Sequence, residues 1–307
     1  MHEPIVTIDM HTAGEPLRII KSGAPGPVGQ TILEKRRWLR ENADWVRTSL
    51  MWEPRGHADM YGCFITEPER ADSDFGAIFL HNEGYSTMCG HAIIALARYA
   101  IDEGLAKNSD QIKIDVPAGQ VTAAAIAEGG RYIGSEFVNV ESFATAFDAT
   151  VAVPELGKVS YDMAYGGAFY AFVDADSLGI DLTPKQSTDL IQAGKQIKNA
   201  IQAIGEPQHP TQGDLSFLYG VIFTSQAHEN NHSQRQKHQC PGYGRMPARR
   251  ERSREVPFPG GAFAWSGGWI AKVAFDQVLH RDIGVRGMED SSRVYQAVRF
   301  DAQRPLS

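Results

Sequence analysis

The sequence predicts a mixed α/β (α+β) protein of two related halves, because similar patterns occur in the same order twice along its 307 residues. Short β-branched and aromatic runs lead to amphipathic helical patterns, and this order begins again after about residue 150. Such mixing of strands and helices favours sheets covered by helices. We detect no sequence repeat between the two halves, so their relationship is inferred from the order of the elements alone.

In the first half, the patterns predict strands at 5–9, 17–20, 60–66 and 76–80, and a hairpin of strands 112–116 and 120–126. An amphipathic helix is predicted over 31–50. Its candidate buried residues are Leu33, Trp38, Trp45, Val46 and Leu50. The basic run Lys35-Arg36-Arg37 in this helix is interpreted as a solvated face.

In the second half, strands are predicted at 151–153, 158–163, 168–173 and 215–224. A second long helix is predicted over 184–204. Its apolar positions are Leu190, Ile191, Ile197 and Ile201.

The stretch 86–104 predicts a loop, then a thiol, then a buried helix. Its apolar residues fall at helical spacing and form two stripes, and Gly104 is a suitable stop signal. Cys89 is therefore expected in the first turn of this helix. Free N–H groups and the helix dipole stabilise anions there, which favours a thiolate at Cys89 and a substrate carboxylate at Gly90 and His91. From spacing alone, a buried structural cysteine remains an equal alternative.

Composition excludes several classes of function. The chain is 42% hydrophobic and 22% charged, with no apolar run long enough to cross a bilayer, so we expect no membrane partner. The net charge of −7 argues against nucleic acid. Three cysteines without paired spacing predict no metal site, and with no secretory pattern at the start we expect a cytoplasmic protein with reduced thiols.

Four segments together resemble the proline racemase family, which includes proline racemases, 4-hydroxyproline epimerases and trans-3-hydroxy-L-proline dehydratases. They are DMHTAGEPLR at 9–18, EPRGHADMYG at 53–62, MCGH at 88–91 and YGGAFYA at 165–171. The resemblance runs from about Ile5 to about Thr224. The segment LHNEGY at 80–85 is most similar to the dehydratase branch.

The resemblance implies a diaminopimelate-epimerase-like fold, in which two similar domains each wrap a sheet around a central helix. We expect the first domain at 1–150, the start of the second at 151–232, and an atypical tail at 233–307, which leaves the second domain incomplete. The implied activity is cofactor-independent dehydration of trans-3-hydroxy-L-proline to Δ1-pyrroline-2-carboxylate. Proline racemase or 4-hydroxyproline epimerase is the alternative. Hydroxyproline or proline is the implied small-molecule partner, and a homodimer is a compatible assembly.

The resemblance also implies roles for four residues. Cys89 is the candidate base, Gly90 and His91 are expected to bind the substrate carboxylate, and Tyr61 to wall the ring pocket. His91 as a catalytic acid and Tyr61 as a core residue remain alternatives. Cys63 is expected to be a small core residue.

Within the segment 53–62, His57 is expected to hydrogen-bond its own loop. The family pattern has a second motif, Asp-Arg-Ser-Pro-(Cys or Thr)-Gly, after Thr224. It is absent here. Cys240, followed by Pro241-Gly242, is a poor substitute because a turn follows it.

From about Ser233 the sequence becomes rich in arginine, glycine and proline, with 13 Lys and Arg against 7 Asp and Glu. We interpret this switch as another reading frame or a misassigned splice junction, with a divergent tail as the alternative. We expect 233–267 to be poorly ordered. An inactive relic that lacks its second half-site is therefore a further alternative function.

Overall fold

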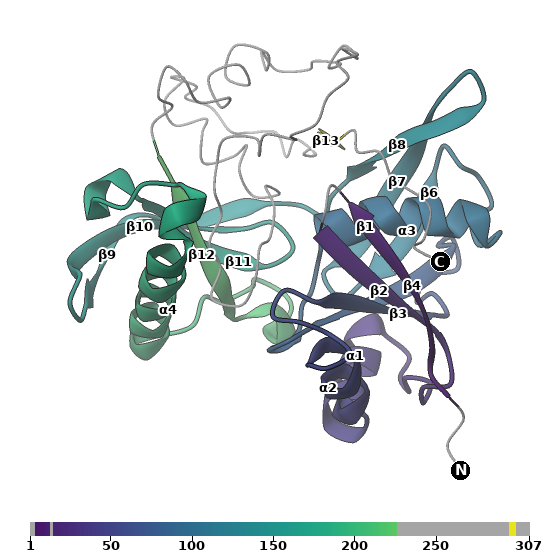
Figure 1. The fold of residues 1–307 in the computed structure, drawn as a ribbon, viewed down its shortest axis with the longest axis horizontal. Coiled ribbons are helices and arrows are strands. Elements are labelled where there is room, and N and C mark those ends of the chain that lie inside the picture. Colours follow the sequence, from purple (N-terminus) through teal and green to yellow (C-terminus); the bar gives the residue numbers. More distant parts are fainter. Residues whose placement is uncertain (1–3, 13–14, 226–294, 299–307) are drawn as a thin grey trace.

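The computed structural model describes residues 4–12, 15–225 and 295–298, and these form two sheets side by side (Figure 1). The first sheet contains β1 (Val6–Thr12), β2 (Glu15–Ser22), β3 (Tyr61–Thr66), β4 (Phe75–His81), β5 (Gly84–Tyr85), β6 (Ile112–Val116), β7 (Gly119–Glu128), β8 (Arg131–Val138) and β13 (Tyr295–Val298). Its strand order is β1-β2-β3-β4-β6-β7-β8-β13, with β5 paired to β4. The second sheet has the order β12-β11-β10-β9.

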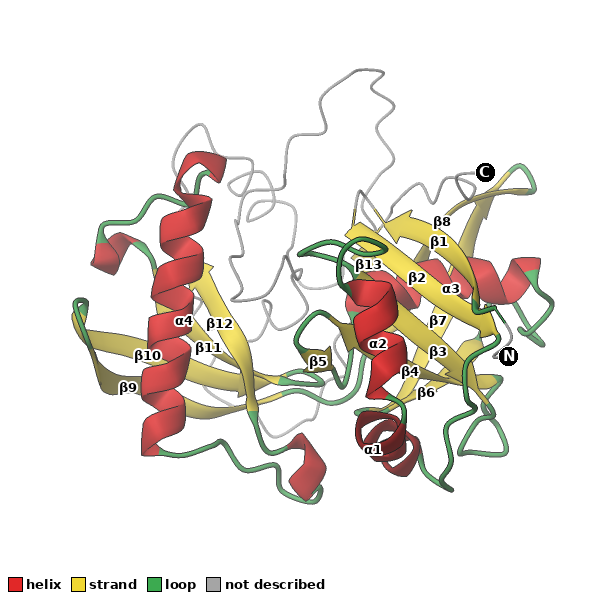
Figure 2. Ribbon diagram, turned by 60° about the horizontal axis from the view of Figure 1, so that its bottom comes forward, coloured by secondary structure: helices red, strands yellow, loops and turns green. Residues whose placement is uncertain are grey.

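Helices cover both faces of the first sheet (Figure 2). Helices α1 (Ile32–Asn42) and α2 (Asp44–Met51) lie on one face, and α3 (Gly90–Asp102) lies on the other. The strands follow this division residue by residue. In β4, Ala77 and Phe79 pack in the core with α3, whereas Ile78 and Leu80 pack with α1 and α2.

The second sheet contains β9 (Phe143–Val153), β10 (Gly157–Tyr165), β11 (Phe169–Asp174) and β12 (Leu218–Thr224). Helix α4 (Ser187–Ile204) packs on it through Leu190, Ala193, Ile197 and Ile201. The predicted apolar position Ile191 is wrong, because this side chain is 36% exposed. Strand β9 crosses the domain boundary expected at 150, and the change of sheet occurs before Phe143.

One unit occurs in both sheets. An antiparallel hairpin is followed by helices and then by a strand that returns parallel to the second strand of the hairpin. In the first sheet the unit is β1, β2, α1 with α2, and β3. In the second sheet it is β10, β11, α4 and β12. The prediction of two related α/β halves is therefore confirmed by the topology.

The single helix predicted over 31–50 is wrong, because α1 ends at Asn42 and α2 begins at Asp44. Of the residues predicted to be buried, Val46 is fully buried, but Trp45 is 45% exposed. The solvated face predicted for the basic run is also wrong at Lys35, which is 7% exposed. Its ammonium group donates to Thr66 Oγ1 at 2.8 Å and to the carbonyl of Glu67 at 2.7 Å.

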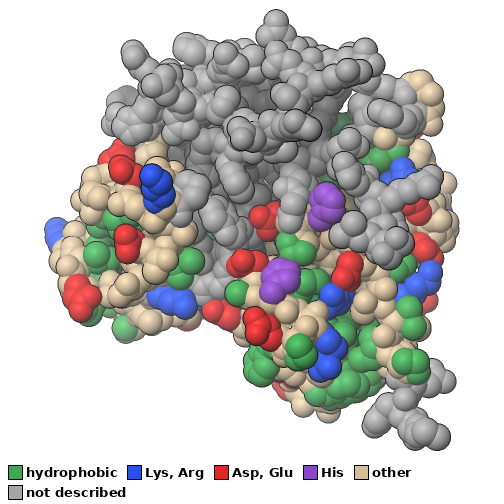
Figure 3. Space-filling view, viewed as in Figure 1, with side chains coloured by type: hydrophobic (Ala, Val, Ile, Leu, Met, Phe, Trp, Pro, Cys, Tyr) green, Lys and Arg blue, Asp and Glu red, His purple; other side chains and the backbone are tan. Residues whose placement is uncertain are grey.

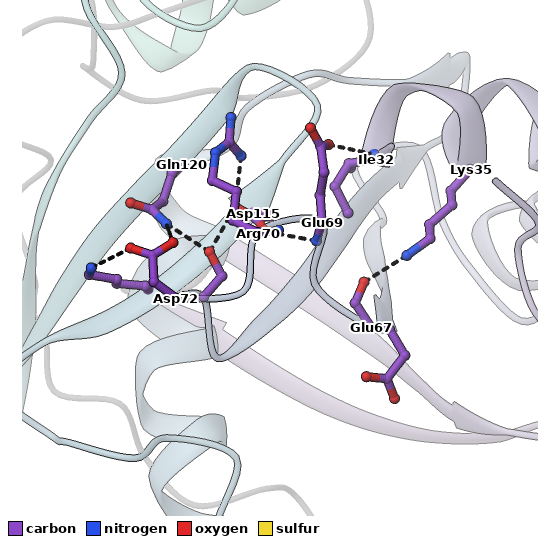
Figure 4. A network of polar contacts seen from close by, with 10 residues as sticks. Ile32, Lys35, Glu67, Glu69, Arg70, Asp72, Asp115 and Gln120 are labelled. Carbon is purple, nitrogen blue, oxygen red and sulfur yellow. Dashed lines mark hydrogen bonds and ion pairs between the residues drawn. The ribbon is translucent and has the colours of Figure 1, made fainter. Parts of the chain in front are cut away.

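A polar network ties the connection between β3 and β4 to α1 and to β6 (Figure 4). Asp115 is fully buried on β6 and accepts hydrogen bonds from the backbone N–H groups of Glu69 and Arg70, each at 2.8 Å. Its other oxygen accepts from Ser73 Oγ and from the Arg70 guanidinium. Because every contact satisfies a buried charge, the network fixes this connection.

Hydrogen bonds from side chains to backbone carbonyls hold the two halves together near the start of α3. Thr87 Oγ1 donates to the carbonyl of Gly167, and Asn139 Nδ2 donates to the carbonyl of Gly166 at 2.9 Å. Gly167 has φ +101°, and a Cβ there would lie 2.5 Å from Cβ of Met88. Only glycine fits this close approach. Cys240 and the segment 233–267, for which poor order was expected, lie outside the described residues.

Candidate active site

Cys89 is the residue immediately before α3, as the sequence predicts. It has extended backbone angles, φ −148° and ψ 109°, and its carbonyl accepts the first helical hydrogen bond from Ile93 N at 3.0 Å. The helix behind it is buried along most of its surface, and Cys89 is 1% exposed. Gly90 and His91 form the first turn and are also buried. The thiol is therefore held by a rigid element rather than by a loop.

The His91 ring lies against the thiol. Its Nδ1 is 3.2 Å from Cys89 Sγ, and its Nε2 is 3.3 Å from the carbonyl of Pro16. A carbonyl can only accept, so Nε2 carries the proton and Nδ1 is free to accept from the thiol. Thr12 Oγ1 donates to the His91 carbonyl at 2.9 Å and anchors the same turn to β1. This arrangement can move the thiol proton onto the imidazole.

Burial favours the neutral form of both members of this pair. It raises the pKa of Cys89 to about 12, against hydrogen bonds from the backbone of Ala92 and His91 and from Tyr61 that favour the thiolate. Burial also lowers the pKa of His91 to about 4. Burial thus opposes the effect of the helix N-terminus, which was expected to favour a thiolate. A bound cation would favour the thiolate.

Tyr61, on β3, lies beside the same pair. Its ring contacts the His91 ring edge-on at 5.0 Å between centroids and stacks on His81 at 5.8 Å. Its hydroxyl shares a hydrogen bond with Ser86 Oγ, and both residues are buried. Burial raises the pKa of Tyr61 well above its ordinary value, so the hydroxyl is a hydrogen-bond donor at all ordinary pH values.

The sequence patterns did not single out Glu15, the first residue of β2. Burial, together with the charge of Asp59, raises the pKa of Glu15 to about 7, and the Glu15 charge in turn raises the pKa of Cys89. On the face shown in Figure 3, acidic and histidine side chains gather on the part of the first half that is directed toward the second. Only the position of Glu15 within the segment 9–18 could have identified it.

The second sheet contributes Tyr219, which the sequence patterns also did not indicate. This β12 residue is 3% exposed, and its ring contacts His81 at 5.8 Å and Tyr170 at 5.5 Å between centroids. Burial raises the pKa of Tyr219 well above its ordinary value. Residues from both halves therefore meet beside Cys89.

Other candidates lie elsewhere or act locally. Cys63 is fully buried in the core of the first sheet, as predicted. His57 Nδ1 accepts from Asp59 N at 3.2 Å, the loop hydrogen bond that was expected. Across 4–12, 15–225 and 295–298, no group of three metal-ligating side chains is present. In the same residues, every helix is too short or too polar to cross a bilayer.

Sequence comparison with known proteins identifies the family to which this chain is similar. The proline racemase family model matches residues 7–247. The trans-L-3-hydroxyproline dehydratase of Xenopus tropicalis is 50% identical over 221 residues, covering 71% of this chain and 64% of the relative. The trans-3-hydroxy-L-proline dehydratases of Colwellia psychrerythraea and Homo sapiens are 53% and 47% identical, with 62% and 66% of their lengths covered. The chain thus spans less than two thirds of these curated relatives.

Two solved structures share the fold. A hydroxyproline epimerase from Agrobacterium vitis, with bound trans-4-hydroxy-L-proline, has a TM-score of 0.68 and 25% identity, covering 73% of this chain and 67% of that one. A probable proline racemase from Agrobacterium radiobacter, with bound carbonate, has a TM-score of 0.67 and 27% identity, covering 72% and 66%. By sequence and by fold, the chain belongs to the proline racemase family.

Proposed function

We propose that this chain provides the first half-site, and the start of the second, of a trans-3-hydroxy-L-proline dehydratase. The observation that carries the proposal is the identity of about half of all aligned residues to dehydratases, together with a thiol–imidazole pair at the start of a buried helix. In this proposal Cys89 is the base and His91 receives its proton. The backbone at Gly90 and His91 binds the carboxylate, and Tyr61 walls the ring.

The substrate supplies charges that favour the ionised thiol. Its secondary ammonium group would favour the Cys89 thiolate, and its carboxylate would be stabilised by the N-terminus of α3. Glu15 is placed to balance the ammonium group, because its charge already acts on Cys89. Because the bound substrate holds its α-carbon next to the base, proton transfer needs no bimolecular encounter, and this proximity contributes much of the rate enhancement.

The proposed reaction balances without a further reactant. The Cys89 thiolate takes the α-proton, and the electron pair of the broken C–H bond forms the C2–C3 double bond. His91, which holds the former thiol proton, gives it to the departing 3-hydroxyl, so that water leaves and both Cys89 and His91 end neutral. The resulting enamine tautomerises to Δ1-pyrroline-2-carboxylate. Because the leaving group sits on C3, elimination needs no second thiol on the opposite face of the ring.

Racemisation or epimerisation is the competing proposal, supported by the two solved relatives. That reaction needs a second acid on the opposite face of the α-carbon. Of the two cysteines in the part of the chain that the structure describes, Cys63 is buried in the core, so it does not offer such a group. The identity of about half of the aligned residues to dehydratases is what favours dehydration.

The test compares two proteins, each with two substrates. One protein is the chain as printed. The other is a chimera in which residues 226–307 are replaced by the corresponding segment of the frog relative. We expect the chimera to form the imine from trans-3-hydroxy-L-proline and to leave the optical rotation of L-proline unchanged. Racemisation of proline without imine formation would overturn the assignment. We expect the printed chain to be nearly inactive, as a relic would be, because it lacks the second family motif.

We also propose a cytoplasmic setting and a homodimer for the chimera. The two buried free cysteines are compatible with a reducing compartment. Fractionation of cells that express a tagged chain tests the compartment, and light scattering tests the dimer. A secreted or monomeric protein would contradict these assignments.

A further inference from the structure

One face of α1 contacts the second half of the molecule. Leu33, Arg36 and Arg37 lie three and four positions apart, so their side chains share this face. Leu33 packs against the core of the second sheet, and the Arg37 guanidinium forms an ion pair with Asp214. Asp214 belongs to η3 (Gly213–Leu215), the short helix that precedes β12 and lies beside α1 in Figure 2. The basic run of α1 is therefore part of an interface between the two halves.

Arg36 lies between its two neighbours on this face and contacts both halves. Its Nη2 donates to the carbonyl of Tyr85, in the first half, at 2.8 Å. Its guanidinium carbon lies 5.6 Å from the centroid of the Phe217 ring, in the second half. A guanidinium group at this distance is attracted to the face of an aromatic ring, and more strongly where water is excluded. The Arg36 Nε is buried and has no hydrogen-bond partner among the described residues, so water is excluded here.

The carbonyl that Arg36 holds belongs to the segment 85–89, which ends at the thiol. Within this segment, Thr87 Oγ1 donates to the carbonyl of Gly167 in the second half. Met88 lies so close to Gly167 that no side chain fits between them. The second half therefore contacts the segment directly, and it contacts the same segment a second time through the Arg36 guanidinium.

We propose that this face of α1 is a latch that holds the second half over Cys89. The latch consists of Leu33, Arg36 and Arg37 on one side and Asp214 and Phe217 on the other. Breaking it lets the second half move away from the segment 85–89, so that a reagent reaches the thiol, which is now only 1% exposed, more often. The latch itself needs no substrate and does not depend on the proposed function. Only its consequence for turnover does.

The ion pair between Arg37 and Asp214 is the part of the latch that can be changed without disturbing either core. The two side chains are 47% and 38% exposed, so substitutions there leave no buried cavity. The two residues also belong to different halves. Exchanging their charges therefore restores the attraction across the interface, whereas reversing one charge replaces the attraction by a repulsion.

The experiment measures how fast iodoacetamide alkylates Cys89 in the full chain without substrate, by mass spectrometry of the peptide that contains Cys89. The variants are Arg37→Glu, Asp214→Arg and the double variant that exchanges the two charges. We expect each single variant to be alkylated about fivefold faster than the parent, because it loses an ion pair and gains a like-charge contact. The double variant should return to within about twofold of the parent.

A fourth variant tests the buried part of the latch. Phe217→Leu keeps an apolar side chain but removes the aromatic face from Arg36, and it should also be alkylated about fivefold faster at Cys89. Alkylation at the parent rate in Phe217→Leu or in either single charge variant would overturn the proposal. A double variant that is alkylated as fast as the single variants would overturn it too, because the two charges would then act independently.

Two controls separate the latch from general effects of substitution. Arg40→Glu reverses a charge on the same helix, but Arg40 pairs with Glu41 of α1 itself, so the Cys89 rate should stay unchanged. Cys63 lies in the core of the first sheet, and its alkylation should remain slow in every variant. Equal acceleration at Cys63 and Cys89 would mean that the substitution unfolds the first half, and would refute the latch. Equal acceleration in Arg40→Glu and Arg37→Glu would refute it as well.

Discussion

In the first sheet, the hairpin β1–β2 is followed by α1, α2 and the parallel strand β3; in the second, β10–β11 is followed by α4 and β12. Beyond this shared unit the two regions differ. The first continues into β4 and α3 and places Cys89 at the helix start, whereas the described part of the second ends just after β12. The repeated unit therefore supplies the scaffold of both halves. Cys89, by contrast, belongs to elements that follow this unit in the first half.

The largest expected effect is on imine formation, and it tests whether Cys89 of the first half is the reactive group. Cys89→Ser in the chimera should lower imine formation by on the order of 10²–10⁴-fold, because an alkoxide is far less accessible than a thiolate. Steady-state kinetics with trans-3-hydroxy-L-proline gives the value. Cys63→Ala removes the other buried thiol of the first sheet and should keep most of the activity. Equal losses in both variants would contradict the proposed role of Cys89.

The next effect concerns the polar network that stiffens the first sheet. Asp115→Ala should lower the free energy of unfolding by about 3–5 kcal/mol, because it leaves several buried donors and a guanidinium without their acceptor. Denaturant unfolding by circular dichroism measures the change. Glu41→Ala removes an exposed ion pair with Arg40 and should be almost silent. A silent Asp115→Ala would show that the network is dispensable.

A smaller effect tests the contact between the halves. Gly167→Ala should cost about 2–3 kcal/mol, from its positive φ and from the clash with Met88. Gly179→Ala is the matched control, since Gly179 also has positive φ but has nothing within 4 Å of an added Cβ, and it should cost about 1 kcal/mol. If the two variants unfold at the same denaturant concentration, the close approach of the sheets contributes nothing.

The smallest effect is a pH dependence that originates in the first half. The folded-state pKa of Glu15 is raised from 4.5 to about 7, so its contribution to stability is present below pH 4.5 and is lost as pH rises toward 7. Glu15→Gln should therefore be about 2 kcal/mol more stable than the parent at pH 8, with little difference at pH 4.5. Thermal unfolding at both pH values measures it. If the difference in stability between Glu15→Gln and the parent were the same at both pH values, it would contradict a raised pKa for the buried Glu15 carboxyl.

Much of the fold was predictable because local patterns decide it. The loop–Cys–Gly pattern correctly predicted the start of α3, and the hairpin of β6 and β7 was predicted from Pro117-Ala118-Gly119. The burial of Lys35 was not predictable, because it depends on acceptors more than 30 positions away in sequence. The break between α1 and α2 at Ala43 was not predictable either, because no Gly or Pro marks it in the sequence.

The site was predictable only in part, for a related reason. Cys89, His91 and Tyr61 belong to recognisable segments, and the structure brings them together. Tyr219 lies on another sheet, and its contact with the His81 ring is visible only in the packed structure. The competition between burial and the helix dipole at Cys89 also needs the packed structure, because a sequence does not give the extent of desolvation.

The burial of α3 has a consequence for how long the site survives. A helix buried along most of its surface cannot open by local fraying at its start, so the amide hydrogens of its first turns should exchange with solvent only when the whole first half unfolds. Because Cys89 immediately precedes that helix, the position of its thiol should be maintained for as long as the first half stays folded.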